Sequence, residues 1–453
     1  MEIAKGNWIG FDTVFYHEKT SVFGTSVEDV IDYGQMEIDP KGLAAYLDYG
    51  YCVFGHTPVK HVKYLLPHES LHIVEGKLQV KKKSDSIESK LGVAAHVDDV
   101  LGMLEDRIQR WASSFGEDIL IPTSGGFDSR LMNVLVKDKS RIRSYTYGTS
   151  FDQGSSREAV YAQLLSKRLG TYWQRIDLGQ FNKYIPDWYN MFGPTVGASG
   201  TYHMEFYEKI QAIENPRKLY LLSGIIGDAW AGAVSVPEIT GPDAYLKLGY
   251  THGMSADASR ALSIGYQDLI EPIYEEQRNL LSIPEYRIIA AMRTKMMLLQ
   301  YLIKVPSAYG FEGYSPFIEE DIALSMLNLP TVQKANRKWQ RDFFKQRNLL
   351  FEEEKHRYTY QNSLNYYALL HERLDPLDTN LLREVIDPSY LEWVNMNIAH
   401  IGNIERIFQT LMHTPKVKEV LKRMGFKNNL LEAYFAYITI KPIEILLSKR
   451  NAS

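Results

Sequence analysis

The sequence predicts an α/β fold in which helices flank a parallel sheet, and three observations support this prediction. An apolar segment, Ile119-Leu-Ile-Pro122, leads through a turn rich in serine and glycine into an amphipathic helix. Strand-like and helix-like segments then alternate as far as Ser223. Beyond about Glu275 the pattern is mainly helical. Such alternation is typical of βαβ units, in which ligands bind at the carboxyl ends of the parallel strands.

Residues 1–90 are predicted to form a small β-rich domain. A capped helix is expected after Asp39, where Pro-Lys-Gly precedes an apolar run, because aspartate is a preferred N-cap. The polar segment Lys81 to Lys90 is expected to be a linker. The predicted strands lie within Trp8 to Tyr16, Val22 to Thr25 and Leu71 to Val80, the last interrupted by a Glu-Gly turn.

Residues 91–350 are predicted to form the α/β domain, and residues 351–453 a helical C-terminal region. The α/β domain begins with a helical stripe of apolar residues from Val97 to Trp111. The clearest later helix covers Arg287 to Ile303. Between these, the expected strands are Ile142 to Tyr147, Tyr172 to Ile176 and Lys218 to Ser223, and the expected helices are Leu131 to Val136 and Arg157 to Leu169.

The composition limits the classes of function. A formal net charge of -4 gives no electrostatic reason to expect nucleic acid or an anionic membrane as the main partner. No apolar run approaches the roughly 18 residues that cross a bilayer. The single cysteine, Cys52, excludes an intramolecular disulfide and a cysteine-based zinc cluster. These features favour a protein of the reducing cytoplasm.

The turn Ser124-Gly125-Gly126-Phe127-Asp128-Ser129 is the strongest functional signal. Two glycines allow the backbone to approach an anion, and the N–H groups that begin the next helix are free to bind phosphate. The hydroxyls of Ser124 and Ser129 add donors. Asp128 beside phosphates is best explained as a Mg²⁺ ligand. The alternative is an ordinary Ser/Gly turn. It is disfavoured because the complete motif stands between a predicted strand and a predicted helix.

This hexapeptide resembles the SGGxDS loop of the ATP pyrophosphatases, which split ATP between the α and β phosphates. The resemblance implies an adenine nucleotide alpha hydrolase-like fold that binds ATP and Mg²⁺. A second Mg²⁺ ligand is expected because magnesium on a triphosphate is held by one or two protein carboxylates. Ser223-Gly-Ile-Ile-Gly-Asp-Ala provides Asp228, with Gly224 at the nucleotide, just after an apolar strand. A Gly-Asp turn alone is weak evidence.

Four segments, in order and spacing, resemble the asparagine synthetase family. Asp128 and Asp228 match its two magnesium-binding segments, Gly310-Phe-Glu-Gly-Tyr-Ser-Pro-Phe-Ile-Glu is similar to its GVExRxPFLD, and Asn336-Arg-Lys-Trp339 is similar to its GRxKxxLR. The resemblance implies that Lys338 stabilises the charge that develops between the α-phosphate and the acyl carbon. The alternative is that Lys338 lies on a solvated helix face. Arg337 and Arg341 could assist with phosphate.

The N-terminal segment resembles the end of the family's glutaminase domain, of the N-terminal nucleophile type, but it carries no nucleophile. Glutamine-using members begin with a cysteine, whereas this chain begins Met1-Glu2. We therefore expect residues 1–90 to be a truncated remnant and glutamine not to be the nitrogen donor. Ile225 stands where family members commonly carry glutamate or tyrosine near the incoming nitrogen, and an aliphatic side chain takes no proton. Glu312 or a tyrosine could supply the base.

The first hypothesis is therefore an ATP-dependent carbon–nitrogen ligase that adenylates a small-molecule or peptide carboxylate and then admits an amine or ammonia. A separate protein could deliver the ammonia. The second hypothesis is a catalytically altered protein that binds nucleotide and serves a partner. A third, adenylation of a nucleic-acid base as in thiolation enzymes, is disfavoured by the single cysteine and the acidic balance.

Overall fold

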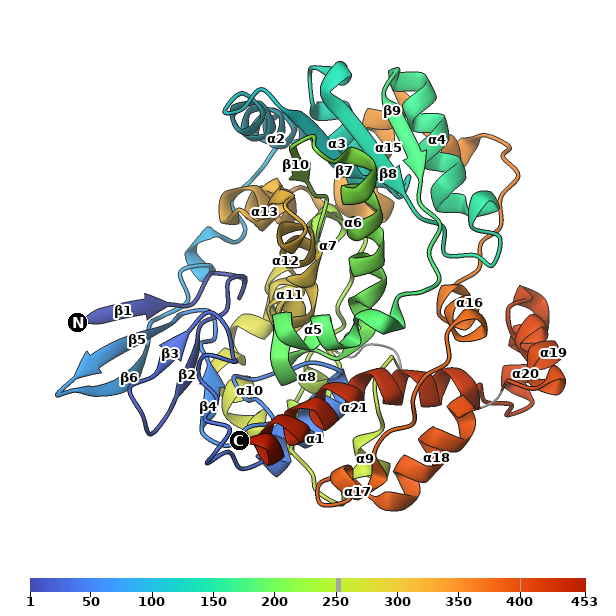
Figure 1. Cartoon of the computed structure of the whole chain (residues 1–453). Helices are drawn as coiled ribbons and strands as arrows, with labels where there is room; N and C mark the ends of the chain where they lie inside the picture. The colour runs from blue at the N-terminus through green and yellow to red at the C-terminus, as the bar shows by residue number, and fades with distance from the viewer. Residues whose placement is uncertain (250–253, 400) are drawn as a thin grey trace.

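The computed structural model describes residues 1–249, 254–399 and 401–453. Its centre is a five-stranded sheet in the order β11-β10-β7-β8-β9, and every neighbouring pair is parallel. Helices surround this sheet in the upper part of the molecule (Figure 1). The predicted α/β fold with a parallel sheet is thus confirmed. The strands are β7 (Asp118–Pro122), β8 (Ile142–Thr146), β9 (Tyr172–Arg175), β10 (Leu219–Leu222) and β11 (Glu312–Tyr314).

The strand order creates a topological switch point between β7 and β10. From β7 the chain adds β8 and β9 on one side, and it then returns to add β10 and β11 on the other side. Leu120 of β7 lies opposite Leu221 of β10 on one side and Arg143 of β8 on the other. Ile119, Leu120 and Ile121 have no exposed surface, as expected for the central strand of a parallel sheet covered on both faces. The carboxyl ends of β7 and β10 therefore lie side by side.

The helices around the sheet follow the predicted pattern closely. α2 (Val97–Ala112) and α4 (Arg157–Leu169) coincide with their predicted spans, and α3 (Phe127–Leu135) begins four residues earlier than expected. The helix expected over 287–303 is instead two helices, α11 (Pro284–Leu299) and α12 (Tyr301–Ala308). At the break, the side-chain amide of Gln300 donates to the Met297 carbonyl at 3.0 Å, which favours a local turn over a continuous helix.

The other helices mostly lie below the sheet in the same view. They include α6, which packs against α12, and α7, which packs against α3, α11 and α13. No described helix is both long enough and apolar enough to span a membrane. The remaining helices are α5 (Ile185–Phe192), α6 (Thr201–Glu214), α7 (Gly227–Ala231), α8 (Pro242–Leu246), α9 (Ala258–Ala261), α10 (Glu271–Gln277), α13 (Glu320–Leu327), α14 (Thr331–Lys334), α15 (Lys338–Lys345), α16 (Leu364–His371), α17 (Thr379–Leu382), α18 (Pro388–Ala399), α19 (Asn403–Met412), α20 (Pro415–Arg423) and α21 (Asn429–Ala452).

The N-terminal segment forms two small antiparallel sheets, ordered β1-β5-β6 and β3-β2-β4. The hairpin predicted within residues 71–80 is present, with Leu71 opposite Val80. The strand predicted from Trp8 to Tyr16 is wrong for most of its length, because only its last two residues pair with neighbouring strands. The strands are β1 (Glu2–Lys5), β2 (Phe15–His17), β3 (Phe23–Gly24), β4 (Val62–Tyr64), β5 (Glu69–Val74) and β6 (Lys77–Lys82).

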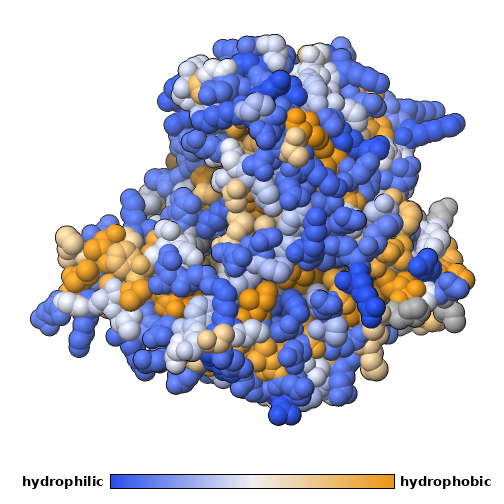
Figure 2. Space-filling view, in the orientation of Figure 1, coloured by the Kyte–Doolittle hydropathy of each residue, from blue (hydrophilic) through white to orange (hydrophobic). Residues whose placement is uncertain are grey.

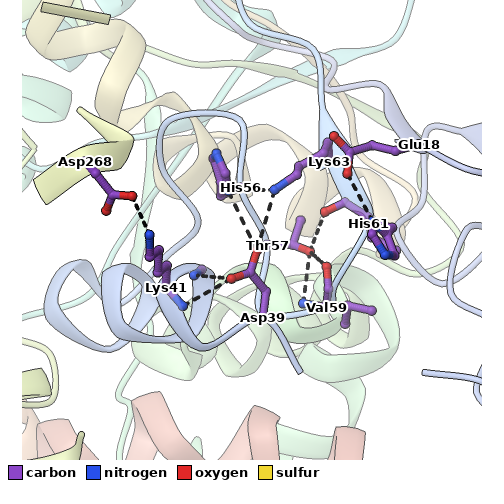
Figure 3. Close-up of polar contacts among 11 residues, drawn as sticks. Glu18, Asp39, Lys41, His56, Thr57, Val59, His61, Lys63 and Asp268 are labelled. Atoms are coloured by element: carbon purple, nitrogen blue, oxygen red, sulfur yellow. Dashed lines mark hydrogen bonds and ion pairs between the residues drawn. The ribbon is translucent and has the colours of Figure 1, made fainter. Parts of the chain in front are cut away.

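Asp39 fixes the first helix, α1 (Pro40–Tyr49), as the sequence predicts. Its carboxylate accepts the N–H groups of Lys41 and Gly42, each at 3.1 Å. The other carboxylate oxygen lies 3.5 Å from Lys63 Nζ and 3.8 Å from His56 Nδ1. Figure 3 shows how these contacts join the start of α1 to the loop that leads into β4. One capping residue therefore holds together two segments of the N-terminal region.

The C-terminal helix α21 packs beside α1, as Figure 1 shows. The Tyr46 hydroxyl donates to the Thr439 carbonyl at 2.8 Å, and Lys449 Nζ pairs with Glu28 at 2.7 Å. The face of the molecule in Figure 2 is mainly hydrophilic, with hydrophobic side chains concentrated in a few areas. Segments almost four hundred residues apart thus share one layer of the fold.

Candidate functional site

The turn between β7 and α3 has the geometry of a tight phosphate-binding loop. Ser124 Oγ accepts the Gly126 N–H, and Ser129 Oγ accepts the Ser124 N–H, both at 3.3 Å. Gly125 has φ +68, and a Cβ there would lie 2.3 Å from the Cβ of Tyr161. Only glycine fits this position. The turn brings the first N–H groups of α3, which lack helical partners, to the carboxyl edge of the sheet.

Asp128 and Asp228 lie together across the switch point. Asp128 is the second residue of α3 and Asp228 the second residue of α7. The backbone N–H and the negative charge of Asp228 are both close enough to the Asp128 carboxylate to change its pKa. A Cβ on Gly224 would lie 3.2 Å from the Cβ of Asp128, so the two strand ends are in close contact. The structure therefore brings the two predicted magnesium ligands to one place, at the ends of adjacent strands.

The environment of Asp128 makes its charge costly. Its side chain is only 15% exposed. Burial raises the pKa of Asp128 to about 6; the negative charge of Asp228 adds to this rise, and the Arg337 guanidinium opposes it. Asp228 beside it is exposed to water, but the two negative charges repel each other, and the pair therefore gains stability from a bound cation.

Arg337 provides a positive partner for Asp128. Its guanidinium lies 2.6 Å from the Asp128 carboxylate, and its Nε donates to the side chain of Gln340 at 2.7 Å. Asn336 and Arg337 have φ values of 51 and 57. Two consecutive residues other than glycine in the left-handed region store strain, which is common at ligand-binding sites. The segment before α15 is thus bent so that an arginine meets the glycine turn.

Lys338 takes a different direction. It begins α15, its side chain is 49% exposed, and its ammonium contacts Asp342 one turn later. Of these two adjacent cations, Arg337 contacts the Asp128 carboxylate, whereas Lys338 contacts Asp342 on the exposed surface of its own helix. The catalytic assignment of Lys338 stays a prediction.

A buried arginine, which sequence analysis did not single out, supports the turn from below. Arg130 has no exposed surface. It donates to the Gly125 carbonyl at 2.6 Å and to both carboxylate oxygens of Glu352, at 2.9 and 3.1 Å. The rings of Phe127, Phe344, Phe351 and Tyr161 surround its guanidinium. The signal in the sequence was an arginine on the otherwise apolar face of α3.

Ile225, the position that lacks the family's base, follows Gly224 at the site, whereas Glu312, considered as a replacement base, lies away from it. Ile225 is 5% exposed and lies three residues beyond the end of β10. Glu312 is exposed and begins β11, level with Tyr220. It therefore lies toward the amino ends of the strands, whereas Gly224 is beyond their carboxyl ends. Cys52 is buried, and burial raises the pKa of its thiol well above the usual value. That thiol has no access to a substrate amide.

The residues at the switch point fit a magnesium nucleotide. Gly125 and Gly224 leave space that any Cβ would fill, and the carboxylates supply the oxygen ligands that Mg²⁺ prefers. In the described parts of the chain, no three acidic, histidine or cysteine side chains gather as a cluster able to hold a metal ion. The donor set therefore suits a cation that shares its coordination with phosphate and water more than a permanently bound metal.

Comparisons with known proteins leave the family open. No family model and no curated protein matches the chain. Among solved structures, the chain is similar to the NH3-dependent NAD synthetase from Campylobacter jejuni in complex with the nitrate ion, with a TM-score of 0.26 and 12% sequence identity. That alignment covers 45% of this chain and 94% of the synthetase chain. At this TM-score the likeness carries no weight, and the description of the fold rests on the strand order.

Proposed function

We propose that the chain is an ATP-dependent carbon–nitrogen ligase of the asparagine synthetase type, which releases AMP and pyrophosphate. The observation that carries the proposal is the meeting of Asp128 and Asp228 over the glycine turn at the switch point. The resemblance of the four sequence segments adds support, because the two aspartates that it pairs are far apart in the chain and adjacent in space.

The proposed reaction assigns a task to each part of the site. The N–H groups of the turn and of α3 bind the phosphates, and Asp128 with Asp228 would hold Mg²⁺, which supplies neutralising charge when bound. A substrate carboxylate attacks the α-phosphorus, pyrophosphate leaves, and an amine or ammonia then displaces AMP from the acyl group. Arg337 exchanges its bond to Asp128 for one to phosphate, and Lys338 assists if its bond to Asp342 opens. The site contributes alignment and charge.

The nitrogen donor in this proposal is an amine or free ammonia. The thiol of Cys52 is buried and cannot attack glutamine. Ammonia would come from solution or from a separate partner protein. The acceptor is a small-molecule or peptide carboxylate, and we propose cytoplasmic operation without nucleic acid or membrane.

A second candidate function is nucleotide binding without turnover, in service of a partner protein. Two observations favour it: the aliphatic Ile225 beside the site, and the outward contact of Lys338 with Asp342. Both would lower the chemical rate without preventing ATP from binding.

The test is to incubate the protein with Mg²⁺, ATP, ammonium and a panel of amino acids, peptides and other carboxylates, and to separate the nucleotides. The ligase hypothesis expects AMP and pyrophosphate in equal amounts, dependent on one carboxylate. Asp228→Asn should lower the rate at least a hundredfold, whereas Asp243→Asn is the matched control, because Asp243 is also the exposed second residue of a five-residue helix, α8. ADP as the product would refute the ligase hypothesis. Tight ATP binding with no pyrophosphate from any substrate would favour the second candidate.

A further inference from the structure

Lys295 of α11 lies where a second helix meets the nucleotide site. α7, which carries Asp228, packs against α11. Ala291 and Met292, one turn before Lys295 on the same side of α11, are buried. Lys295 therefore leaves the helix on the side that faces the protein interior, and its side chain is half-buried.

The ammonium of Lys295 has no bonded partner among the described residues. Burial lowers the pKa of Lys295, and the negative charge of Asp228 opposes this decrease. The half-buried Lys334, by contrast, pairs with Glu285 at 2.9 Å. An ammonium that is partly removed from water and has no hydrogen-bond acceptor is costly, so Lys295 is placed for an anion that arrives later.

The charges at the site indicate which anion this is. Asp128 is paired with Arg337, whereas Asp228 attracts the Lys295 ammonium without a bond to it among the described residues. A divalent cation held by the two aspartates would be coordinated by phosphate oxygens of the nucleotide on the side that faces away from the carboxylates. A cation within electrostatic reach of Asp228 is then also within reach of those oxygens.

We propose that Lys295 binds the β,γ-pyrophosphate part of Mg·ATP from the α7 side of the site, opposite the glycine turn. This assignment rests on the proposed function and names a phosphate ligand outside the segments that carry the family resemblance. Lys295 acts as a fixed positive charge that neutralises the pyrophosphate before and after the α–β bond breaks. Lys338 need not leave Asp342 for this neutralisation to occur.

The experiment compares wild type with three variants by calorimetric titration with Mg²⁺ and α,β-methylene-ATP, and with AMP. Lys295→Met should weaken the methylene analogue about 10- to 100-fold, the usual cost of a lost charge-assisted hydrogen bond, and leave AMP binding unchanged. Lys295→Arg should keep most of the affinity. Lys304→Met is the matched control, because Lys304 is also half-buried and burial also lowers its pKa, but its nearby carboxylate is Asp12.

Each result separates the two proposals. If wild-type protein binds neither ligand, the proposed function fails and the assignment of Lys295 fails with it. If wild type binds the methylene analogue and Lys295→Met binds it equally well, only the assignment of Lys295 is refuted. A parallel loss of AMP affinity, or an equal loss in Lys304→Met, would also refute it, since a contact with pyrophosphate cannot produce either result.

Discussion

Replacement of Asp128 by asparagine should stabilise the protein while it removes nucleotide binding. The pKa of Asp128 rises from 3.8 to about 6 on folding, because of burial first and of the neighbouring Asp228. At 1.36 kcal/mol for each unit, ionisation of this group lowers the free energy of unfolding by about 3 kcal/mol. Asparagine resembles the protonated carboxyl in shape and can still accept a hydrogen bond from Arg337, so the variant avoids this cost.

Because folding raises the pKa of Asp128, the stability difference between wild type and Asp128→Asn depends on pH. Below the unfolded pKa near 3.8 the carboxyl is protonated in both states, and wild type suffers no penalty. The penalty grows as the pH rises toward the folded pKa of about 6 and is constant above it. Asp128→Asn should therefore exceed wild type by about 3 kcal/mol at pH 8 and by about half of that at pH 5.

The assay is urea unfolding at pH 5 and pH 8, each with and without Mg²⁺ and α,β-methylene-ATP. Ligand at a hundred times its Kd should raise the unfolding free energy of wild type by about 2.7 kcal/mol and leave Asp128→Asn unchanged. Asp342→Asn is the control, because its exposed ion pair with Lys338 contributes about 0–1 kcal/mol. A variant that is less stable than wild type at pH 8, or that is protected by ligand as well as wild type, would refute the account of this site.

Two further predictions concern the support of the glycine turn. Arg130→Met should lower the free energy of unfolding in urea by about 3–5 kcal/mol, because it leaves Glu352 without its buried partner. A decrease below about 1 kcal/mol would contradict the stabilising role of the Arg130–Glu352 pair. Gly125→Ala should abolish binding of the methylene analogue and cost more stability than Gly76→Ala. Both glycines have positive φ, but an added Cβ would overlap Tyr161 at Gly125 and would meet nothing within 4 Å at Gly76. Equal losses of stability in the two variants would show that backbone strain alone, and not the overlap with Tyr161, causes the loss.

The sequence predicted the parts of the site that local chemistry determines. Gly125, Gly126 and Asp128 follow a strand and begin a helix, so their placement depends on a short segment. Asp228 follows another strand, and the rule that parallel strands end at one edge was enough to bring the two carboxylates together. Strand alternation also predicted β8, β9 and β10 within one or two residues.

The missed features depend on contacts between distant segments. Arg337 meets Asp128 across 209 residues, and Arg130 meets Glu352 across 222. Helical periodicity cannot tell whether Lys338 or its neighbour Arg337 faces the turn, because left-handed backbone at Asn336 and Arg337 redirects both side chains. Lys295 lies outside every sequence motif, so the sequence alone could not single it out. The domain limits at 90 and 350 stay predictions.

The packing of α21 against α1 has a consequence for biosynthesis. A ribosome releases residues in order, so α1 leaves the exit tunnel long before α21, whose carbonyl at Thr439 accepts the hydroxyl of Tyr46. Until then the apolar side of α1 lacks its final cover and is open to chaperones or to association with other nascent chains. Lesions in α21 should therefore leave α1 without its cover and increase the dependence of folding on chaperones.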